Sequence, residues 1–304
     1  MEKDCAIILC TKNGAEFLAD QLESLKNQTH GFDLYINDDG SDDKTEELIK
    51  SFQKKTRINI FYTQNIYNSA PKNFLNTLKL IKQEYSFYFF CDQDDIWEKN
   101  KIEISKKKLA NVDKNLPCLF CTKTLIIDAN SMVIDSSKTF QRPPCLSNAL
   151  VQSIAGGNTM CFNHKTKILL DQIFSINDVV SHDWITYLLV SAFEGKIIYS
   201  SNPLVKYRKH KNNLIGPNKS LDEMLLRING LLRGQMRIWS EKNLNVLNDF
   251  DLPERSKEIL DKFEKKAHKG NFFERFKFIF NSNVFRQTFL SNLALHFAIL
   301  IRKI

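Results

Sequence analysis

A short acidic stretch after residue 91 has the residue types and spacing that could perform chemistry. An apolar, aromatic run over residues 85–91 leads directly into Asp92, Asp94 and Asp95. Carboxylates are poor strand formers and costly to bury, so such a cluster at a strand end requires a compensating cation. Asp92 and Asp94 can converge on a hard divalent metal, which prefers oxygen ligands and shares them with phosphates. The alternative is a solvated turn in which Asp94 or Asp95 caps the next helix.

Three further residues could take part in catalysis or binding. Asp39 could accept hydrogen bonds from a nucleobase or ribose, or form a turn before Gly40. Asp183 opens a helical pattern and could deprotonate an acceptor hydroxyl, or be a first-turn residue favoured by the helix dipole. His210 lies in a basic loop and could contact a metal or a phosphate, or be plain surface. Taken singly, each residue leaves both alternatives open.

The elements that carry these residues alternate between strands and helices over the first 110 residues. Apolar runs predict strands at residues 4–11, 32–37, 58–62 and 85–91, and helical spacing predicts helices at 16–27, 45–54, 71–84 and from 96 onward. Ser41, Asp42 and Asp43 are expected to cap the second helix. The alternation predicts an open, mainly parallel α/β sheet, whose ligands bind beyond the carboxyl ends of the strands. Thr11, Asp39 and the acidic stretch all follow such strand ends.

A different pattern follows residue 111. Apolar runs predict strands at residues 118–128 and 132–134 around a hairpin turn, an apolar stretch at 159–162, a helix at 185–193, and extended pieces at 196–200 and 204–208. From residue 220 onward there is no clear strand signal, and Pro253 separates two helical stretches.

Five motifs appear in the order seen in family 2 glycosyltransferases, and the chain resembles this family over roughly residues 4–216. The acidic motif and the last motif are most similar to those of the bacterial rhamnosyltransferase-like branch. The motifs are Thr11-Lys12-Asn13-Gly14, Asp38-Asp39-Gly40-Ser41, Asp92-Gln93-Asp94-Asp95-Ile96-Trp97, His182-Asp183-Trp184 and Tyr207-Arg208-Lys209-His210.

The resemblance implies a GT-A fold, which is a Rossmann-like, mainly parallel α/β sheet with flanking helices. It also implies a nucleotide-sugar donor, Mg²⁺ or Mn²⁺ as cofactor, and inversion at the anomeric carbon. Carried over by position, it implies nucleotide-sugar contacts by Thr11, Asn13, Asp39, Lys72 and Asp92, metal binding by Asp94 and His210, and Asp183 as the catalytic base. Asp92 is assigned to the ribose, and Asp95 is expected to be no more than a helix cap before Trp97.

Two positions depart from the family pattern. Ser69 stands where the family often has glycine, which affects the expected geometry of Lys72 and Asn73. His182 replaces the acid that many members carry before the residue equivalent to Asp183, although the rhamnosyltransferase-like branch tolerates histidine there.

The bulk composition is that of a globular protein, with 43% hydrophobic and 26% charged residues. Seven cysteines without a regular framework predict a reducing compartment, and the Cys118 and Cys121 pair lies in an apolar, strand-like run. The charged N-terminus has no signal-peptide pattern, and no apolar run reaches about 18 residues, so we expect no spanning helix.

The last 44 residues are basic and rich in phenylalanine. Residues 261–304 carry nine Lys or Arg against three acids, which supplies +6 of the net +8, and nine of the 23 Phe. Their helical spacing predicts an amphipathic segment that associates with an anionic membrane surface. The alternative is a helical pair that packs on the enzyme or a partner, with its charges in solvent. The Phe and Leu content argues against nucleic acid as a partner.

We therefore expect a catalytic domain over residues 1–216, with a nucleotide-sugar-binding half at 1–110 and an acceptor-binding half at 111–216. A helical C-terminal extension follows over 217–304 and is basic and Phe-rich from about 261.

The expected function is that of an inverting, metal-dependent glycosyltransferase for bacterial surface polysaccharide such as O-antigen or capsule. Its donor would be a UDP-, dTDP- or GDP-linked sugar, and its acceptor a glycan or a polyprenyl-diphosphate-linked glycan. The expected location is the cytoplasmic face of the inner membrane. The alternatives are a non-catalytic nucleotide-sugar-binding or assembly subunit and a nucleotidyltransferase.

Overall fold

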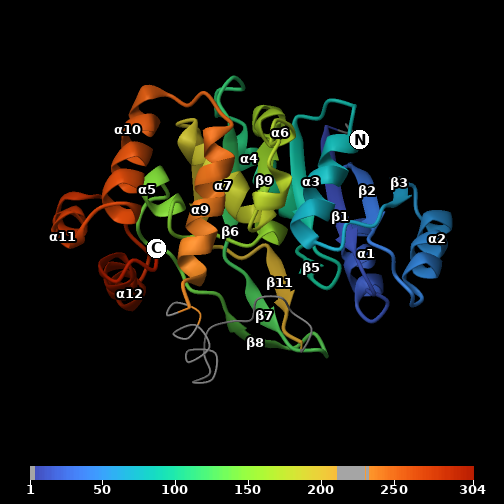
Figure 1. The fold of residues 1–304 in the computed structure, drawn as a ribbon. Helices are drawn as coiled ribbons and strands as arrows, with labels where there is room; N and C mark the ends of the chain where they lie inside the picture. The colour runs from blue at the N-terminus through green and yellow to red at the C-terminus, as the bar shows by residue number, and fades with distance from the viewer. Residues whose placement is uncertain (1–3, 211–229, 231–232) are drawn as a thin grey trace.

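The main element of the protein is a seven-stranded sheet in the order β10-β6-β9-β4-β1-β2-β3 (Figure 1). The structure is a computed structural model that describes residues 4–210, 230 and 233–304. All neighbouring strands are parallel except β9, which runs antiparallel to both β4 and β6. The strands are β1 (Cys5–Thr11), β2 (Asp33–Asp38), β3 (Asn59–Gln64), β4 (Phe87–Cys91), β6 (Cys118–Thr122), β9 (Cys161–Asn163) and β10 (Lys196–Ser200).

A second, four-stranded sheet lies beside the carboxyl end of β4, in the order β5-β11-β7-β8. Its strands are β5 (Ile96–Trp97), β7 (Leu125–Ile127), β8 (Val133–Ser136) and β11 (Val205–Arg208). The hairpin predicted around the turn after residue 127 is confirmed, because β7 and β8 pair antiparallel. The single strand predicted over residues 118–128 is wrong: it divides into β6 and β7, which belong to different sheets.

The sheet is mainly parallel and has helices on both faces, as predicted. Side chains of β1 alternate between two buried clusters, and each cluster is covered by its own set of helices. One face is covered by α1 (Leu18–Lys26), α2 (Thr45–Lys55) and α4 (Lys101–Leu109). The other face is covered by α3 (Ala70–Leu80), α5 (Leu146–Ala149), α6 (His164–Asp171) and α7 (His182–Ala192). Two short 3₁₀ turns, η1 (Gly157–Thr159) and η2 (Ile176–Asp178), lie in the connections between these elements.

The turn before α2 differs from the predicted cap. Lys44 occupies the N-cap position of α2, and no side-chain capping bond is made there. Of the expected caps, Asp43 bonds the first helical residue, since its Oδ1 accepts the Thr45 N–H at 2.9 Å. Ser41 instead accepts the N–H of Asn13 through its Oγ at 2.8 Å. The polar residues after β2 therefore connect two loops and cap the helix only in part.

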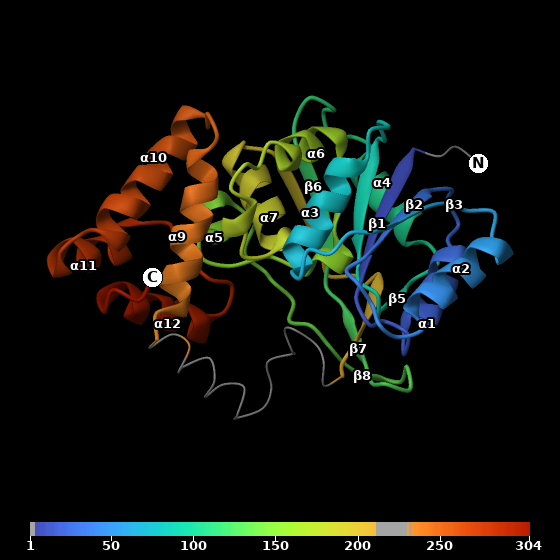
Figure 2. The same cartoon turned by 45° about the vertical axis from the view of Figure 1, so that its right-hand side comes forward.

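The described residues 233–304 form helices and connecting segments without a strand, as the sequence predicted. They are α9 (Gln235–Asn248), α10 (Glu254–Lys262), the π-helical turn η3 (Phe263–His268), α11 (Phe272–Asn281) and α12 (Phe289–Leu300). These helices stand against the end of the molecule opposite β2 and β3 (Figure 2), and Leu247 and Phe263 share a buried cluster with Ile185 of α7. The predicted boundary at residues 216 and 217 lies outside the described residues. Among the described helices, none is long and apolar enough to cross a membrane.

Candidate active site

The loops after β1 and β4 are joined by the side chain of Gln93. Thr11 Oγ1 donates to Gln93 Oε1 at 2.6 Å, and the Lys12 N–H donates to the same oxygen at 2.9 Å. A Cβ on Gly14 would lie 2.5 Å from this oxygen, so only glycine permits the approach. The acidic turn is thereby fixed against the end of β1. Nothing in the local sequence marks Gln93 as this bridge, so its role could not be predicted.

The predicted nucleotide residues Thr11, Asn13 and Asp39 come together at neighbouring strand ends. Asn13 adopts a left-handed conformation with φ of 50°, and its Oδ1 accepts the Asp42 N–H at 3.0 Å. The buried Asp39 accepts the N–H groups of Tyr67 and Asn68 through one carboxylate oxygen.

Lys72 lies in the first turn of α3. Among the described residues, no hydrogen bond or ion pair joins its side chain to Thr11, Asn13 or Asp39.

The predicted metal residues Asp94 and His210 are in direct contact. His210 Nε2 lies 2.8 Å from Asp94 Oδ2, and both side chains are 16% exposed. The imidazole ring also lies against Phe17 of the β1–α1 loop, with the ring centroids 5.0 Å apart. Asp94 lies in the turn between β4 and β5, and His210 follows the end of β11, so only the fold brings the two side chains together.

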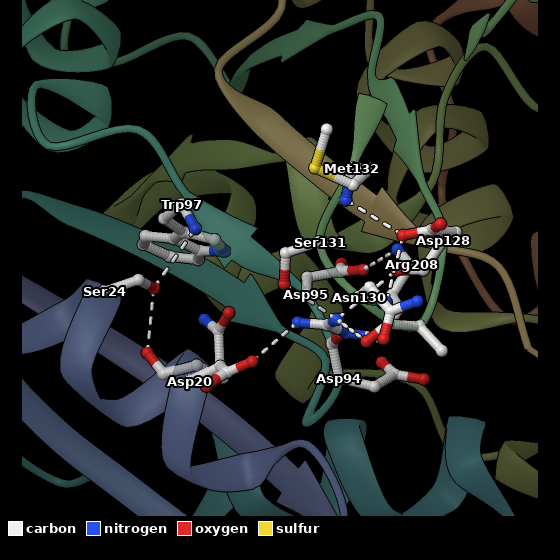
Figure 3. A network of polar contacts seen from close by, with 12 residues as sticks. Asp20, Ser24, Asp94, Asp95, Trp97, Asp128, Asn130, Ser131, Met132 and Arg208 are labelled. Atoms are coloured by element: carbon white, nitrogen blue, oxygen red, sulfur yellow. Dashed lines mark hydrogen bonds and ion pairs between the residues drawn. The ribbon is translucent and has the colours of Figure 1, made fainter. Parts of the chain in front are cut away.

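Arg208 holds this contact in place from the end of β11. Its side chain is fully buried, and its Nε donates to the main-chain oxygen of Asp94 at 3.0 Å. Its Nη1 donates to Ala129 O at 2.9 Å, and its Nη2 pairs with Asp20 at 2.9 Å (Figure 3). The guanidinium therefore connects α1, the acidic turn and the β7–β8 turn, using the several donors that only arginine offers. The sequence alone marks Arg208 only as part of the basic segment that precedes His210.

Asp95 and the segment after it differ from the prediction of a cap and a helix. Residues 96 and 97 form β5, which pairs antiparallel with β11, and α4 begins only at Lys101. Asp95 is fully buried, and it accepts hydrogen bonds from Asn158 Nδ2 and from the Arg208 N–H. Burial, together with the charge of Asp94, raises the pKa of Asp95 to about 7. Pairing with β11, which is remote in sequence, overrides the local helical pattern.

A buried lysine stands on the other side of Asn158. Lys101 is fully buried, its Nζ donates to Asn158 O at 2.6 Å, and it lies 3.1 Å from the centroid of the Trp97 ring. Burial lowers the pKa of Lys101 to about 7. Neither Lys101 nor Asn158 stands out in the sequence, since a lysine at the start of a helix is usually exposed.

Asp183 begins α7 beside this cluster. Its Oδ1 accepts the Trp184 N–H at 2.6 Å, and the backbone of Gly157 also hydrogen-bonds the carboxylate. Burial raises the pKa of Asp183 to about 6. The helix begins at His182, earlier than the predicted residue 185, which makes Asp183 a first-turn residue.

Negative charge accumulates at the carboxyl end of β4. Burial raises the pKa of Asp92 well above its usual range, and the charges of Asp95, Asp94 and Asp183 raise it further. Because the charges of Asp94 and Asp183 both affect the pKa of Asp92, the residues predicted for the metal, the base and the ribose lie close to one another. Carboxylate oxygens and one imidazole nitrogen are a donor set that suits Mg²⁺ or Mn²⁺, and a cation there would offset the repulsion among the acids. The arrangement can hold a metal-bound diphosphate beside a carboxylate base.

The chain is similar to known glycosyltransferases. The family model described as glycosyl transferase family 2 matches residues 6–127. The chain is 26% identical over 252 residues to the dTDP-rhamnosyl transferase RfbG of Shigella flexneri, which covers 79% of this chain and 83% of the relative. It is 23% identical over 220 residues to the putative teichuronic acid biosynthesis glycosyltransferase TuaG of Bacillus subtilis, covering 70% and 82%.

Solved structures share the fold. S. aureus TarS 1–349 in complex with UDP has a TM-score of 0.57 at 16% identity, covering 93% of this chain and 76% of that one. The mannosyltransferase PcManGT from Pyrobaculum calidifontis in complex with GDP-Man and Mn²⁺ has a TM-score of 0.55 at 16% identity, covering 100% and 84%.

Proposed function

We propose, from the match of residues 6–127 to glycosyl transferase family 2 and the similarity to the Shigella rhamnosyl transferase, that this chain is an inverting, metal-dependent member of that family, which transfers a sugar from a nucleotide-linked donor to a hydroxyl group. The observation that carries the proposal is the 2.8 Å contact between Asp94 and His210 beside Asp92 and Asp183. Carboxylates gathered at one strand end destabilise the fold unless a cation offsets their charge, so a purely structural role does not account for them.

Asp94 and His210 would hold Mg²⁺ or Mn²⁺. Bound there, the metal would neutralise the charge that develops on the leaving diphosphate. Thr11, Asn13 and Asp39 would bind the nucleotide at the ends of β1 and β2. Asp92 would bind the ribose, and Lys72 would reach the donor from the start of α3.

Asp183 would act as the catalytic base. Its pKa of about 6 keeps it mostly ionised at neutral pH while leaving it basic enough to accept a proton. It would take the proton of the acceptor hydroxyl as the hydroxyl oxygen attacks the anomeric carbon. The bond to the diphosphate oxygen would break on the opposite side, so the configuration inverts and a nucleoside diphosphate leaves.

The donor would be a UDP-, dTDP- or GDP-linked sugar. The relative in Shigella is a dTDP-rhamnosyl transferase by name, and the structural neighbours were solved with UDP, UDP-GlcNAc and GDP-Man. The acceptor would be a glycan or a polyprenyl-diphosphate-linked glycan of a bacterial surface polysaccharide. The enzyme would then work at the cytoplasmic face of the inner membrane, where such precursors are presented.

A panel of donors tests the proposal. UDP-, dTDP- and GDP-sugars would each be added with Mn²⁺, and the thermal shift and the released nucleotide product would be measured. We expect stabilisation by one donor class and release of its nucleoside diphosphate once an acceptor is present. Release of pyrophosphate from a nucleoside triphosphate would identify a nucleotidyltransferase instead. Stabilisation without turnover over a panel of lipid-linked acceptors would favour a non-catalytic binding subunit.

A further inference from the structure

The C-terminal helices α11 and α12 expose an unusual amount of apolar surface. Eight large side chains on these two helices are each between 46% and 82% exposed, and we call them together the Phe face: Phe272, Phe273, Phe276, Phe280, Phe289, Leu290, Leu293 and Phe297. Within each helix most of them recur three or four positions apart, so they share one side. Exposed apolar surface of this extent marks a site of interaction.

The Phe face belongs to two well-defined helices. Arg275 of α11 is buried, and its guanidinium donates to Leu300 O at 3.3 Å and to Gly270 O, which ties the two helices together. Both helices begin with complete capping boxes, formed by Asn271 with Glu274 and by Thr288 with Ser291. Phe278 and Leu295 fill the buried sides. The exposed side chains are therefore presented by a folded scaffold.

Positive charge surrounds the Phe face. Lys277 lies exposed on α11, and Arg302 lies exposed just after α12. Lys262 and Lys266 are exposed on the preceding turns, and the segment from residue 261 carries most of the net charge of the chain. A partner that binds this surface must therefore cover the phenylalanine side chains and carry negative charge that attracts the lysines and arginines. An anionic bilayer does both, whereas a second copy would bring a like-charged surface against this one.

We propose that the Phe face docks on the surface of an anionic lipid bilayer, with the phenylalanines in the interface and the cations at the headgroups. In both views of the fold α12 lies toward the same side as β5, the strand that follows the acidic turn (Figures 1 and 2). The same bilayer would also carry a lipid-linked acceptor. Only this last link, the delivery of a lipid-linked acceptor, rests on the proposed function.

Vesicle binding of the full-length chain tests docking without any donor or acceptor. Phosphatidylcholine vesicles with and without phosphatidylglycerol would be sedimented with the protein. We expect sedimentation with the anionic vesicles that weakens as salt is added. The double variant Phe273→Gln, Phe289→Gln should lose roughly tenfold or more in partition coefficient, because each ring contributes apolar contact with the interface. Both rings are exposed, so circular dichroism should be unchanged.

Matched variants give the controls. Phe174 is 83% exposed but lies between α6 and α7, so Phe174→Gln should bind vesicles like the wild type. Lys277→Glu with Arg302→Glu should weaken binding to anionic vesicles, whereas Lys54→Glu on α2 should not. Equal binding by the wild type and the double phenylalanine variant would overturn the proposal. Vesicle-independent self-association that the same variant abolishes would also overturn it, with a second copy as the occupant.

Discussion

His210 Nε2 lies 2.8 Å from Asp94 Oδ2, although the two residues are 116 positions apart in the sequence. Arg208 produces this contact, because its buried guanidinium bonds the main-chain oxygen of Asp94 while its own position in β11 places His210 two residues further on. The carboxylate and the imidazole are thus held together before any ligand arrives. A carboxylate oxygen and an imidazole nitrogen this close together are well placed to share a divalent ion.

Replacing the side chain of Asp94 or of His210 should make nucleotide binding independent of the divalent metal and should impair sugar transfer. Asp94→Asn and His210→Gln are each expected to lower sugar transfer by about 10²–10³-fold, because charge on the leaving diphosphate would lose its stabilisation. Nucleoside diphosphate affinity, measured by calorimetry with and without Mn²⁺, should no longer depend on the metal. Glu23→Gln, an exposed acid on α1, serves as the control and should behave like the wild type. Undiminished transfer by the wild type in the presence of a chelator would reject the metal role.

The pH dependence of kcat/KM for sugar transfer should follow the protonation of Asp183. Since burial raises its pKa to about 6 and the base must be deprotonated, kcat/KM should fall about tenfold per pH unit below 6 and level off above it. Asp183→Asn should lower transfer by roughly 10²–10⁴-fold. Donor binding, followed by thermal shift, should be kept. A variant that loses donor binding along with transfer would assign Asp183 to the donor pocket instead of the base.

The positions of the candidate residues at one sheet edge could be predicted from the sequence. Apolar runs of strand length identify β1, β2 and β4, and parallel strands end on the same side of a sheet. Thr11, Asp39 and Asp94 follow these three strands, which are neighbours in the sheet. The hydrophobic pattern and the parallel topology were therefore sufficient to place these three residues at one edge of the sheet.

Contacts between remote segments could not be predicted in the same way. Asp95 looked like a helix cap because Ile96 and Trp97 fit a helical pattern, and only pairing with β11 makes them a strand. Arg208 and Lys101 are buried although nothing in their local sequence indicates it, because their burial depends on partners far along the chain. A single sequence contains the local preferences but not the energies of these non-local pairings.

Arg208 should be important for stability as well as for the site. Arg208→Met would leave the main-chain oxygens of Asp94 and Ala129 without their buried donor, and we expect a loss of about 2–4 kcal/mol in the free energy of unfolding. Guanidinium denaturation followed by circular dichroism would measure it. Lys206→Met is the matched control on the same strand. Lys206 pairs with Glu98 at the surface, so its loss should cost only about 0–1 kcal/mol.

Gly157 should be intolerant of even one added carbon, because His182 leaves it no room. A Cβ at residue 157 would lie 2.2 Å from His182 Nε2, and the imidazole is stacked on Phe74 with the ring centroids 3.9 Å apart. We expect Gly157→Ala to lower the free energy of unfolding by about 1–3 kcal/mol. Transfer should fall as well, since Asp183 follows His182 directly and takes a hydrogen bond from the Gly157 backbone.

A double-mutant cycle would separate this clash from a general effect of the substitution. His182→Ala removes the obstructing ring, so adding Gly157→Ala to it should cost less than adding it to the wild type, with a coupling of about 0.5–3 kcal/mol. Thermal unfolding of the four proteins would measure the coupling. Strict additivity would mean that the glycine is required for its backbone and not for the close approach to His182. Recovery of stability without recovery of transfer would assign the imidazole a separate part in orienting Asp183.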